Sequence, residues 1–191
     1  MIVLGLRVKT GWAAAVLLGG TPSKPVVLDS REIRLADWDQ EHGRQPYHAT
    51  FGTEQTDRAL ITRLVKDVER FSLRAIRQLL REYRTAGHRV RRAAIVVSSL
   101  TDPATIANQH MRAHASEGQL YRRVVEAALT RAAVTFRVTL SQHLHALLTH
   151  SLRRSVATIK RDLAELRHDT TRWRAEEKEA AAAAWLVRRR A

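Results

Sequence analysis

The sequence predicts an α/β protein in which five strands form one mixed sheet with helices on both faces. The first third of the chain contains three strand-like runs joined by short turns, and such strands are antiparallel neighbours. Two later strand-like runs each follow a long helical pattern, so they join the sheet through crossovers. The expected order is therefore β-β-β-α-β-α-β-α, with three antiparallel strands, then two crossover strands, and long C-terminal helices.

The strands are identified from short apolar runs bounded by turn residues. The first strand is expected over residues 2–8 and is apolar on both faces, which is typical of a central strand. The third strand, over residues 26–34, alternates with polar residues in its second half, which favours an edge position. The other strands are expected over residues 12–18, 90–97 and 134–140.

Helices are predicted where apolar residues recur every three to four positions. The first runs from about residue 54 to residue 86. The second begins at Asp102-Pro103, because Asp caps helices and Pro is tolerated in the first turn, and it runs to about residue 133 with a break near 116–118. Trp185 and the small alanines before it are expected to dock the last helix. The last two helices cover residues 142–167 and 174–187.

Residues 36–53 have no sustained period, and we expect a long loop there. Long loops in compact domains often carry function. This loop contains Tyr47, His48 and Phe51, and aromatic side chains beside arginines stack on bases in nucleic-acid-binding proteins. The alternative is that these aromatic groups pin the loop to the domain.

Length and composition indicate one domain over residues 1–191, with residues 142–191 as its C-terminal helical part. The formal net charge is +14, from 33 basic and 19 acidic residues, and 28 of the basic residues are Arg. Because Arg makes planar bidentate contacts with phosphate, nucleic acid is the expected partner. The alternative explanation is a GC-rich coding bias, since Ala also occurs 28 times.

The composition also excludes several classes of protein. The chain has no Cys, so disulfides, thiolate zinc sites and a Cys nucleophile are absent. No apolar stretch reaches the roughly 20 residues of a membrane helix, and no membrane partner is expected. The apolar segment after Met1 lacks a basic n-region and contains Arg7, so it does not match a signal peptide. The expected location is the cytoplasm, in a bacterium.

The chain opens with Gly5-Leu6-Arg7, followed by a short turn and Gly11-Trp12-Ala13. This opening resembles the ribonuclease H-like superfamily and, within it, the RuvC-type Holliday junction resolvases, which have Gly-hydrophobic-Asp in the first strand and a Gly-aromatic turn after it. The last helix carries Glu176, Glu177 and Glu179 ahead of a run of alanines, as the family's last helix carries acids. The resemblance implies a fold whose nucleases hold two metal ions with clustered carboxylates.

At most of the positions where the family has those carboxylates, this chain has residues that are not acidic. The first-strand carboxylate corresponds to Arg7 and the fourth-strand carboxylate to Ser98 or Ser99, so only Glu176 and Glu179 remain acidic. The resemblance therefore implies a degenerate acidic site in which Arg7 binds phosphate directly. Alternatively, Arg7 extends from a strand end to solvent, and the glutamates stabilise the dipole of their helix.

The stretch HMRAHASEGQLYRR places His110, His114, Glu117 and Tyr121 on one helix face. Two His and one Glu at this spacing can ligate zinc. The Glu of a His-Glu-x-x-His motif is absent, and a helix face with buried or half-buried His is the preferred interpretation, so no metal site is predicted. The third interpretation is a polar patch that lines a cleft.

Three functions stay open at this point. The first is a catalytically degenerate domain that binds nucleic acid or another polyanion without a cofactor. The second is a metal-dependent nuclease that uses Mg²⁺ and relocated carboxylates, and the third is a non-enzymatic protein that self-associates or binds a protein partner through its long helices. The expected nucleic-acid-binding residues are Arg7, Lys9, Arg44, Arg91, Arg92 and Arg112, and the expected cleft-lining residues are Ser98, Ser99, His110 and His114. The catalytic candidates are Glu117, Glu176 and Glu179, with Asp102 as a further acid whose simpler role is a helix cap.

Overall fold

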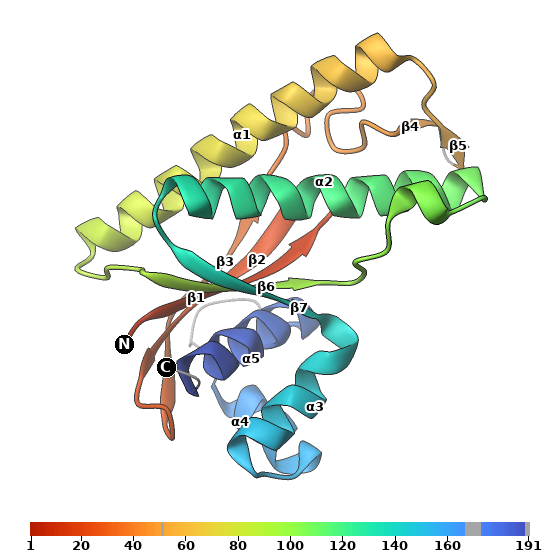
Figure 1. Cartoon of the computed structure of the whole chain (residues 1–191). Coiled ribbons are helices and arrows are strands. Elements are labelled where there is room, and N and C mark those ends of the chain that lie inside the picture. Colours follow the sequence, from red (N-terminus) through yellow and green to blue (C-terminus); the bar gives the residue numbers. More distant parts are fainter. Residues whose placement is uncertain (51, 167–172, 190–191) are drawn as a thin grey trace.

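Five strands form one mixed sheet in the order β3-β2-β1-β6-β7 (Figure 1). The computed structural model describes residues 1–50, 52–166 and 173–189. β2 pairs antiparallel with β1 and β3, whereas β1–β6 and β6–β7 are parallel pairs. The predicted sheet, with three antiparallel strands and two crossover strands, is confirmed.

The strand bounds agree with the expected ones to within two residues. β1 is buried on both faces at the centre of the sheet, and β3 is an edge strand, as expected. The strands are β1 (Val3–Lys9), β2 (Trp12–Gly20), β3 (Pro25–Arg34), β6 (Arg92–Val97) and β7 (Thr135–Leu140).

Two long helices, α1 (Arg58–Thr85) and α2 (Gln109–Arg131), cover one face of the sheet (Figure 1). α1 begins later than expected because the Asp57 carboxylate accepts hydrogen bonds from the first free backbone N–H groups of the helix. α2 is continuous, so the break expected near residues 116–118 is wrong, and its cap is Asn108. Asp102 instead caps a separate 3-10 helix, η1 (Pro103–Thr105).

Three helices cover the other face: α3 (Ser141–Leu152), α4 (Val156–Glu165) and α5 (Ala175–Arg189). The single helix expected over residues 142–167 is therefore wrong. α3 ends at Arg153, whose backbone is left-handed with φ 53°, and Ser155 begins α4 by accepting a hydrogen bond from Thr158 N–H. No helix within the described part of the chain is both long and apolar enough to cross a membrane.

α5 packs directly on β1, as the alanine run predicts. An added Cβ at Gly5 would lie 1.9 Å from the carbonyl oxygen of Ala180, so only glycine allows this approach. Trp185 is 1% exposed, and its Nε1–H donates to the carbonyl oxygen of Pro22 at 2.8 Å. The prediction that Trp185 and the alanines dock the last helix is confirmed.

The expected long loop over residues 36–53 contains a small hairpin, β4 (His48–Thr50) and β5 (Thr53–Glu54), so an entirely irregular loop is wrong. Tyr47 packs against the core and the His48 side chain is buried. These contacts agree with the interpretation that the loop is pinned to the domain. Phe51 lies outside the described residues.

Candidate functional site

The carboxyl ends of β1 and β6 lie side by side at one edge of the sheet, because these strands are parallel neighbours with Arg7 opposite Val96. In open α/β sheets, ligands bind outside the carboxyl ends of strands. This edge presents Arg7 and Lys9 from β1 and Ser98 after β6. A ligand site in a sheet of this kind is therefore expected at this edge.

The Arg7 side chain points to the α5 face, and its guanidinium is fully engaged inside the protein. Nη2 donates to Ser98 Oγ at 2.9 Å, and Nη1 donates to the carbonyl oxygens of Val8 at 3.2 Å and Val96 at 3.4 Å. Nε lies 2.5 Å from Oε2 of Glu179. Since Arg7 is 6% exposed, the alternative in which it extends to solvent is wrong. The guanidinium links β1, β6 and α5.

Two glutamates of α5, Glu176 and Glu179, face basic groups, whereas the buried Glu177 accepts a hydrogen bond from the Arg174 backbone N–H at 2.8 Å. Glu179 Oε1 accepts a hydrogen bond from Ser141 Oγ at 2.8 Å, while its other oxygen forms the ion pair with Arg7. Glu176 Oε1 lies 3.9 Å from Nζ of Lys9. The negative charge that α5 brings to the sheet edge is therefore compensated by the protein's own cations.

A cavity of about 420 Å³ opens at the same edge, on the side of α2. Arg7 does not line it, because its side chain lies on the α5 side. Ser98, Ser99 and His114, which the sequence predicts to line a cleft, do line this cavity. The other polar residues of its wall include Lys9, Thr10, Thr101, Gln119 and Arg122.

Glu117 is fully buried where α2 meets the β4–β5 hairpin. Its Oε1 accepts a hydrogen bond from the Tyr47 backbone N–H at 2.9 Å and lies 3.3 Å from Nδ1 of His48. Burial raises the pKa of the Glu117 carboxyl to about 8, although the Tyr47 N–H opposes that shift. Because α2 and α5 cover opposite faces of the sheet, Glu117 does not join Glu176 and Glu179.

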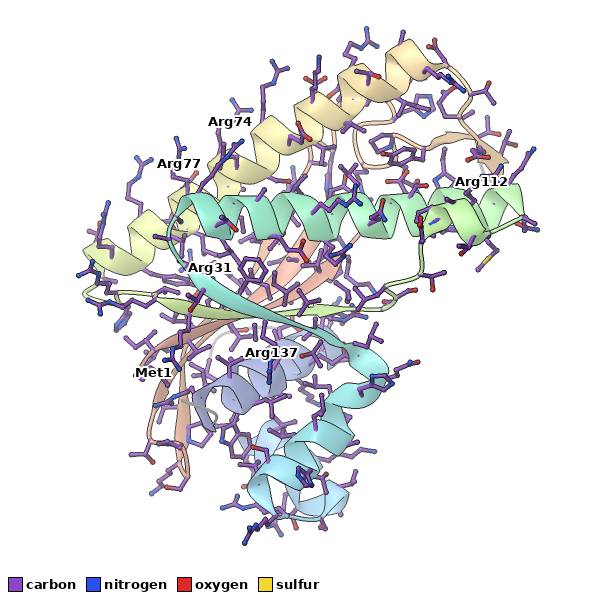
Figure 2. The ribbon with its side chains drawn as sticks, in the orientation of Figure 1. Met1, Arg31, Arg74, Arg77, Arg112 and Arg137 are labelled. Atoms are coloured by element: carbon purple, nitrogen blue, oxygen red, sulfur yellow. The ribbon has the colours of Figure 1, made fainter. Side chains whose placement is uncertain are left out.

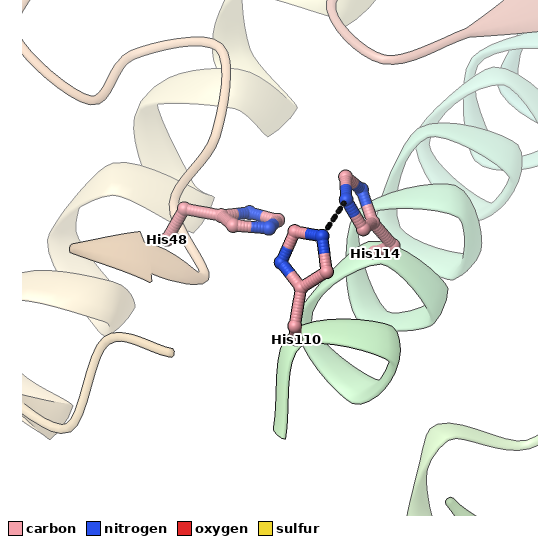
Figure 3. Close-up of side chains that lie close together, drawn as sticks. All are labelled: His48, His110 and His114. Atoms are coloured by element: carbon pink, nitrogen blue, oxygen red, sulfur yellow. Dashed lines mark hydrogen bonds between the residues drawn. The ribbon is translucent and has the colours of Figure 1, made fainter. Parts of the chain in front are cut away.

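Three histidines converge next to Glu117 (Figure 3). His110 and His114, one turn apart on α2, lie with their Nε2 atoms 3.2 Å apart. The ring centroid of His48, from β4, lies 4.7 Å from that of His114 and 5.8 Å from that of His110. Burial lowers the pKa of His48, and the two neighbouring imidazoles lower it further. The sequence places His110 and His114 on one face, but nothing in its local pattern joins His48 to them.

Arg112 and Arg44 both hold the segment that follows β3. Arg112 donates from Nε at 3.0 Å and from Nη2 at 2.5 Å to the carboxylate of Glu54, which ties β5 to α2. The Arg44 guanidinium lies 4.3 Å from the ring centroid of Trp38. The remaining two expected phosphate ligands, Arg91 and Arg92, lie at the start of β6, at the opposite end of that strand from the edge where Arg7 lies.

The outer side of α1 carries a row of exposed basic side chains that we call the α1 ridge. Their spacing of three or four residues places them along one side of the helix. Figure 2 shows Arg74 and Arg77 projecting away from α2. Within the ridge, Arg70 pairs with Asp67. The ridge consists of Arg63, Lys66, Arg70, Arg74, Arg77, Arg81 and Arg84. The sequence contains this signal as a basic stripe offset from the apolar stripe of the same helix.

The arrangement of the sheet and helices defines a ribonuclease H-like fold of the form found in RuvC-type resolvases. No family model and no curated protein matches the sequence. Among solved structures, RuvC of T. thermophilus in complex with a Holliday junction substrate matches with a TM-score of 0.57 and 12% identity, over 97% of this chain and 91% of that chain. The structure of Thermus thermophilus RuvC matches with a TM-score of 0.59 and 10% identity, over 97% and 92%.

The yeast mitochondrial Holliday junction resolvase Ydc2 also matches, with a TM-score of 0.52 and 9% identity, over 98% of this chain and 80% of that chain. These likenesses confirm the predicted resemblance to the RuvC-type branch at the level of fold. Identities of 9–12% carry the fold alone, so the chemistry of this chain has to be argued from its own residues.

Proposed function

We propose that this protein binds polynucleotides through their phosphates and does not cleave them by the two-metal mechanism that the RuvC resemblance implies. The observation that carries the absence of two-metal cleavage is the buried Arg7 guanidinium, ion-paired with Glu179 where the resemblance places a metal-binding carboxylate. An internal cation takes the place of the metal in balancing the charge of Glu179. The exposed cations of the α1 ridge carry the binding of polynucleotides.

The residues at this edge do not fit a pair of magnesium ions. Mg²⁺ requires oxygen ligands in near-octahedral geometry. A guanidinium offers only N–H donors, and its positive charge would repel a metal ion beside it. Ser98 Oγ, at the end of β6, already accepts a hydrogen bond from Arg7. Two-metal cleavage needs several carboxylates at one point, and Glu176 and Glu179, each facing a basic side chain, do not provide them.

The nuclease alternative with relocated carboxylates has less support. Glu117 is buried on α2 and hydrogen-bonded to the backbone of Tyr47. Asp102 accepts from the Ala104 N–H at 3.1 Å, which is the helix-cap role expected as the simpler one. Neither side chain is placed to join Glu176 and Glu179 around a metal ion.

Charge and shape support a polyanionic partner. The α1 ridge presents a row of cations along a helix of 28 residues, which is roughly 42 Å long at 1.5 Å per residue. Lys9 and Arg122 also line the 420 Å³ cavity, but each faces a glutamate, Glu176 and Glu126 respectively, so the α1 ridge carries the charge argument. Contacts to phosphate carry little sequence information, so sequence preference is expected to be weak.

The protein-partner alternative lacks a comparable surface. Among the described residues, the exposed large apolar side chains come from separate segments and not from one helix face. They are Met1, Val26, Leu100, Met111 and Val156. Scattered exposed apolar residues are normal on a monomer.

Binding to a short duplex, a four-way junction and a single strand across a salt series tests the proposal. Affinity is expected to fall steeply with salt, since each neutralised phosphate contributes about 0.9 to the slope of log K against log salt. The triple variant Arg74→Gln, Arg77→Gln, Arg81→Gln should lower that slope by about 2–3. The matched control, Arg153→Gln, Lys160→Gln, Arg161→Gln, removes the same charge from exposed positions near α4 and should leave the slope unchanged. A flat salt dependence overturns the proposal, and equal effects of the two triple variants overturn the role of the ridge.

Cleavage assays on the same substrates with Mg²⁺ or Mn²⁺ test the second half of the proposal. No product is expected, because the acids at the sheet edge are paired with Lys9 and Arg7. Metal-dependent cutting that Glu179→Gln abolishes would show that the edge is a working nuclease centre.

A further inference from the structure

We propose that His48, His110 and His114 form a mononuclear Zn²⁺ site in which Glu117 orients His48. One ring nitrogen from each histidine can be chosen so that all three lie within 4.8 Å of one another. The three side chains come from two segments about 60 residues apart in sequence, and the fold alone brings them together (Figure 3). The inference is independent of the proposed binding of nucleic acid.

The spacing of the nitrogens suits tetrahedral zinc. With Zn–N bonds of about 2.0–2.1 Å, two ligand nitrogens lie roughly 3.4 Å apart. The Nε2 atoms of His110 and His114 are 3.2 Å apart, close to that value without any rearrangement. The chosen nitrogens of all three rings lie within 4.8 Å of one another, and rotation of the exposed His114 ring and the half-buried His110 ring is the adjustment that metal binding would require.

The His48 imidazole supplies a second, independent observation. Its Nδ1 faces Oε1 of Glu117 at 3.3 Å, and in the tautomer with the proton on Nδ1 it donates a hydrogen bond to that oxygen. Its Nε2 is buried and has no hydrogen-bond partner among the described residues. A buried nitrogen lone pair without a partner is unfavourable, and a metal ion at the centre of the three rings would satisfy it.

The contact between His48 and Glu117 is the arrangement that metal-ligating histidines use. The second ring nitrogen donates to a carboxylate, which fixes the tautomer and the ring orientation. Glu117 is itself held by the Tyr47 backbone N–H at 2.9 Å, so the orienting oxygen is fixed by the residue that directly precedes β4.

The chemistry of the donors favours a borderline divalent ion such as zinc. Three imidazoles, with no thiolate in the chain, suit borderline divalent ions rather than Mg²⁺ or Ca²⁺. All three histidines also line a second cavity of about 420 Å³, together with Arg44 and Thr50. That cavity leaves room for a fourth ligand, a water molecule or an anionic oxygen, and three protein ligands with an open position are typical of zinc sites that bind exogenous oxygen ligands.

Titration of untagged, metal-free protein with Zn²⁺ by calorimetry tests the site. One ion per chain is expected. Loss of a residue that orients a metal ligand weakens metal binding by roughly 10- to 100-fold. His114→Ala removes a ligand itself, at an exposed position that does not support the core, and should weaken Zn²⁺ binding by more than that. Glu117→Gln should weaken it within that range. The matched control His150→Ala, exposed on α3 on the other side of the sheet, should bind as the wild type does.

Substitution with Co²⁺ provides a second readout, since a tetrahedral site gives an intense visible spectrum that His114→Ala should abolish. Circular dichroism of each variant confirms that it is folded. The proposal is overturned if wild-type protein binds no zinc. It is also overturned if His114→Ala binds zinc with the affinity of the wild type, as the control His150→Ala is expected to do.

Discussion

Two polar clusters lie on opposite faces of the sheet, and they differ in how completely their members satisfy one another. In the α5 cluster, the Arg7 guanidinium meets Glu179, Ser98 and two backbone carbonyls, so a cation and an anion are already joined. In the α2 cluster, three imidazoles face one another beside Glu117, and His48 Nε2 has no hydrogen-bond partner among the described residues. The closed cluster serves the fold, whereas the open cluster has capacity for a ligand.

The α5 cluster exists only while α5 is docked, and Trp185 is the largest side chain that docks it. Trp185→Ala removes a fully buried ring and its hydrogen bond to Pro22, so the free energy of unfolding should fall by about 3–5 kcal/mol. Chemical denaturation measures it. Val156→Ala, at a 44% exposed position on α4, is the control and should cost no more than about 0.5 kcal/mol. An unchanged midpoint for Trp185→Ala would show that α5 does not support the sheet.

The α2 cluster is expected to respond to metal, which the α5 cluster cannot do. Zn²⁺ at about 100 times its dissociation constant should stabilise the wild type by about 2.7 kcal/mol, because it binds the folded state. His114→Ala should show no such gain, and Arg7→Met should keep it. Thermal melts with and without Zn²⁺ decide this. Equal stabilisation of wild type and His114→Ala would remove the distinction between the two clusters.

The third test asks whether Arg7 stabilises the fold by balancing the charge of Glu179 or only by packing against it. Arg7→Met leaves Glu179 without its counter-charge, and the cost should be about 2 kcal/mol, below the value for a fully buried pair because the Glu179 side chain is 25% exposed. The double variant Arg7→Met, Glu179→Met should be more stable than Arg7→Met, since it leaves no unpaired charge. If the two losses simply add in denaturation experiments, the residues are not coupled.

The sequence predicts the strands well, because short apolar runs between turn residues have few other interpretations. The sequence does not predict a helix break at which the chain changes direction without a glycine or proline. The break between α3 and α4 depends on Arg153 in a left-handed conformation and on Ser155 as a cap, and neither residue interrupts the apolar stripe that continues from Leu152 to Ile159.

The sequence likewise predicts one part of the candidate site and not the rest. Local spacing predicts that His110 and His114 share a helix face, but the third histidine is brought in by the hairpin β4–β5, whose position depends on long-range contacts such as that of Arg112 with Glu54. The resemblance to RuvC-type resolvases identifies Arg7 as unusual, because that family has an Asp at this position of the first strand. Its burial could not be predicted, because the ion pair with Glu179 joins residues 172 positions apart.

The close approach of α5 to Gly5 has a consequence for synthesis of the chain. The strands that it covers, β1, β2 and β6, are complete long before residues 175–189 leave the ribosome. Until then, Val3, Val16 and Leu18 form part of an apolar sheet face without its cover. Domains form as units during translation, and a transiently exposed apolar face favours aggregation. The order of synthesis therefore leaves this apolar face uncovered until α5 emerges.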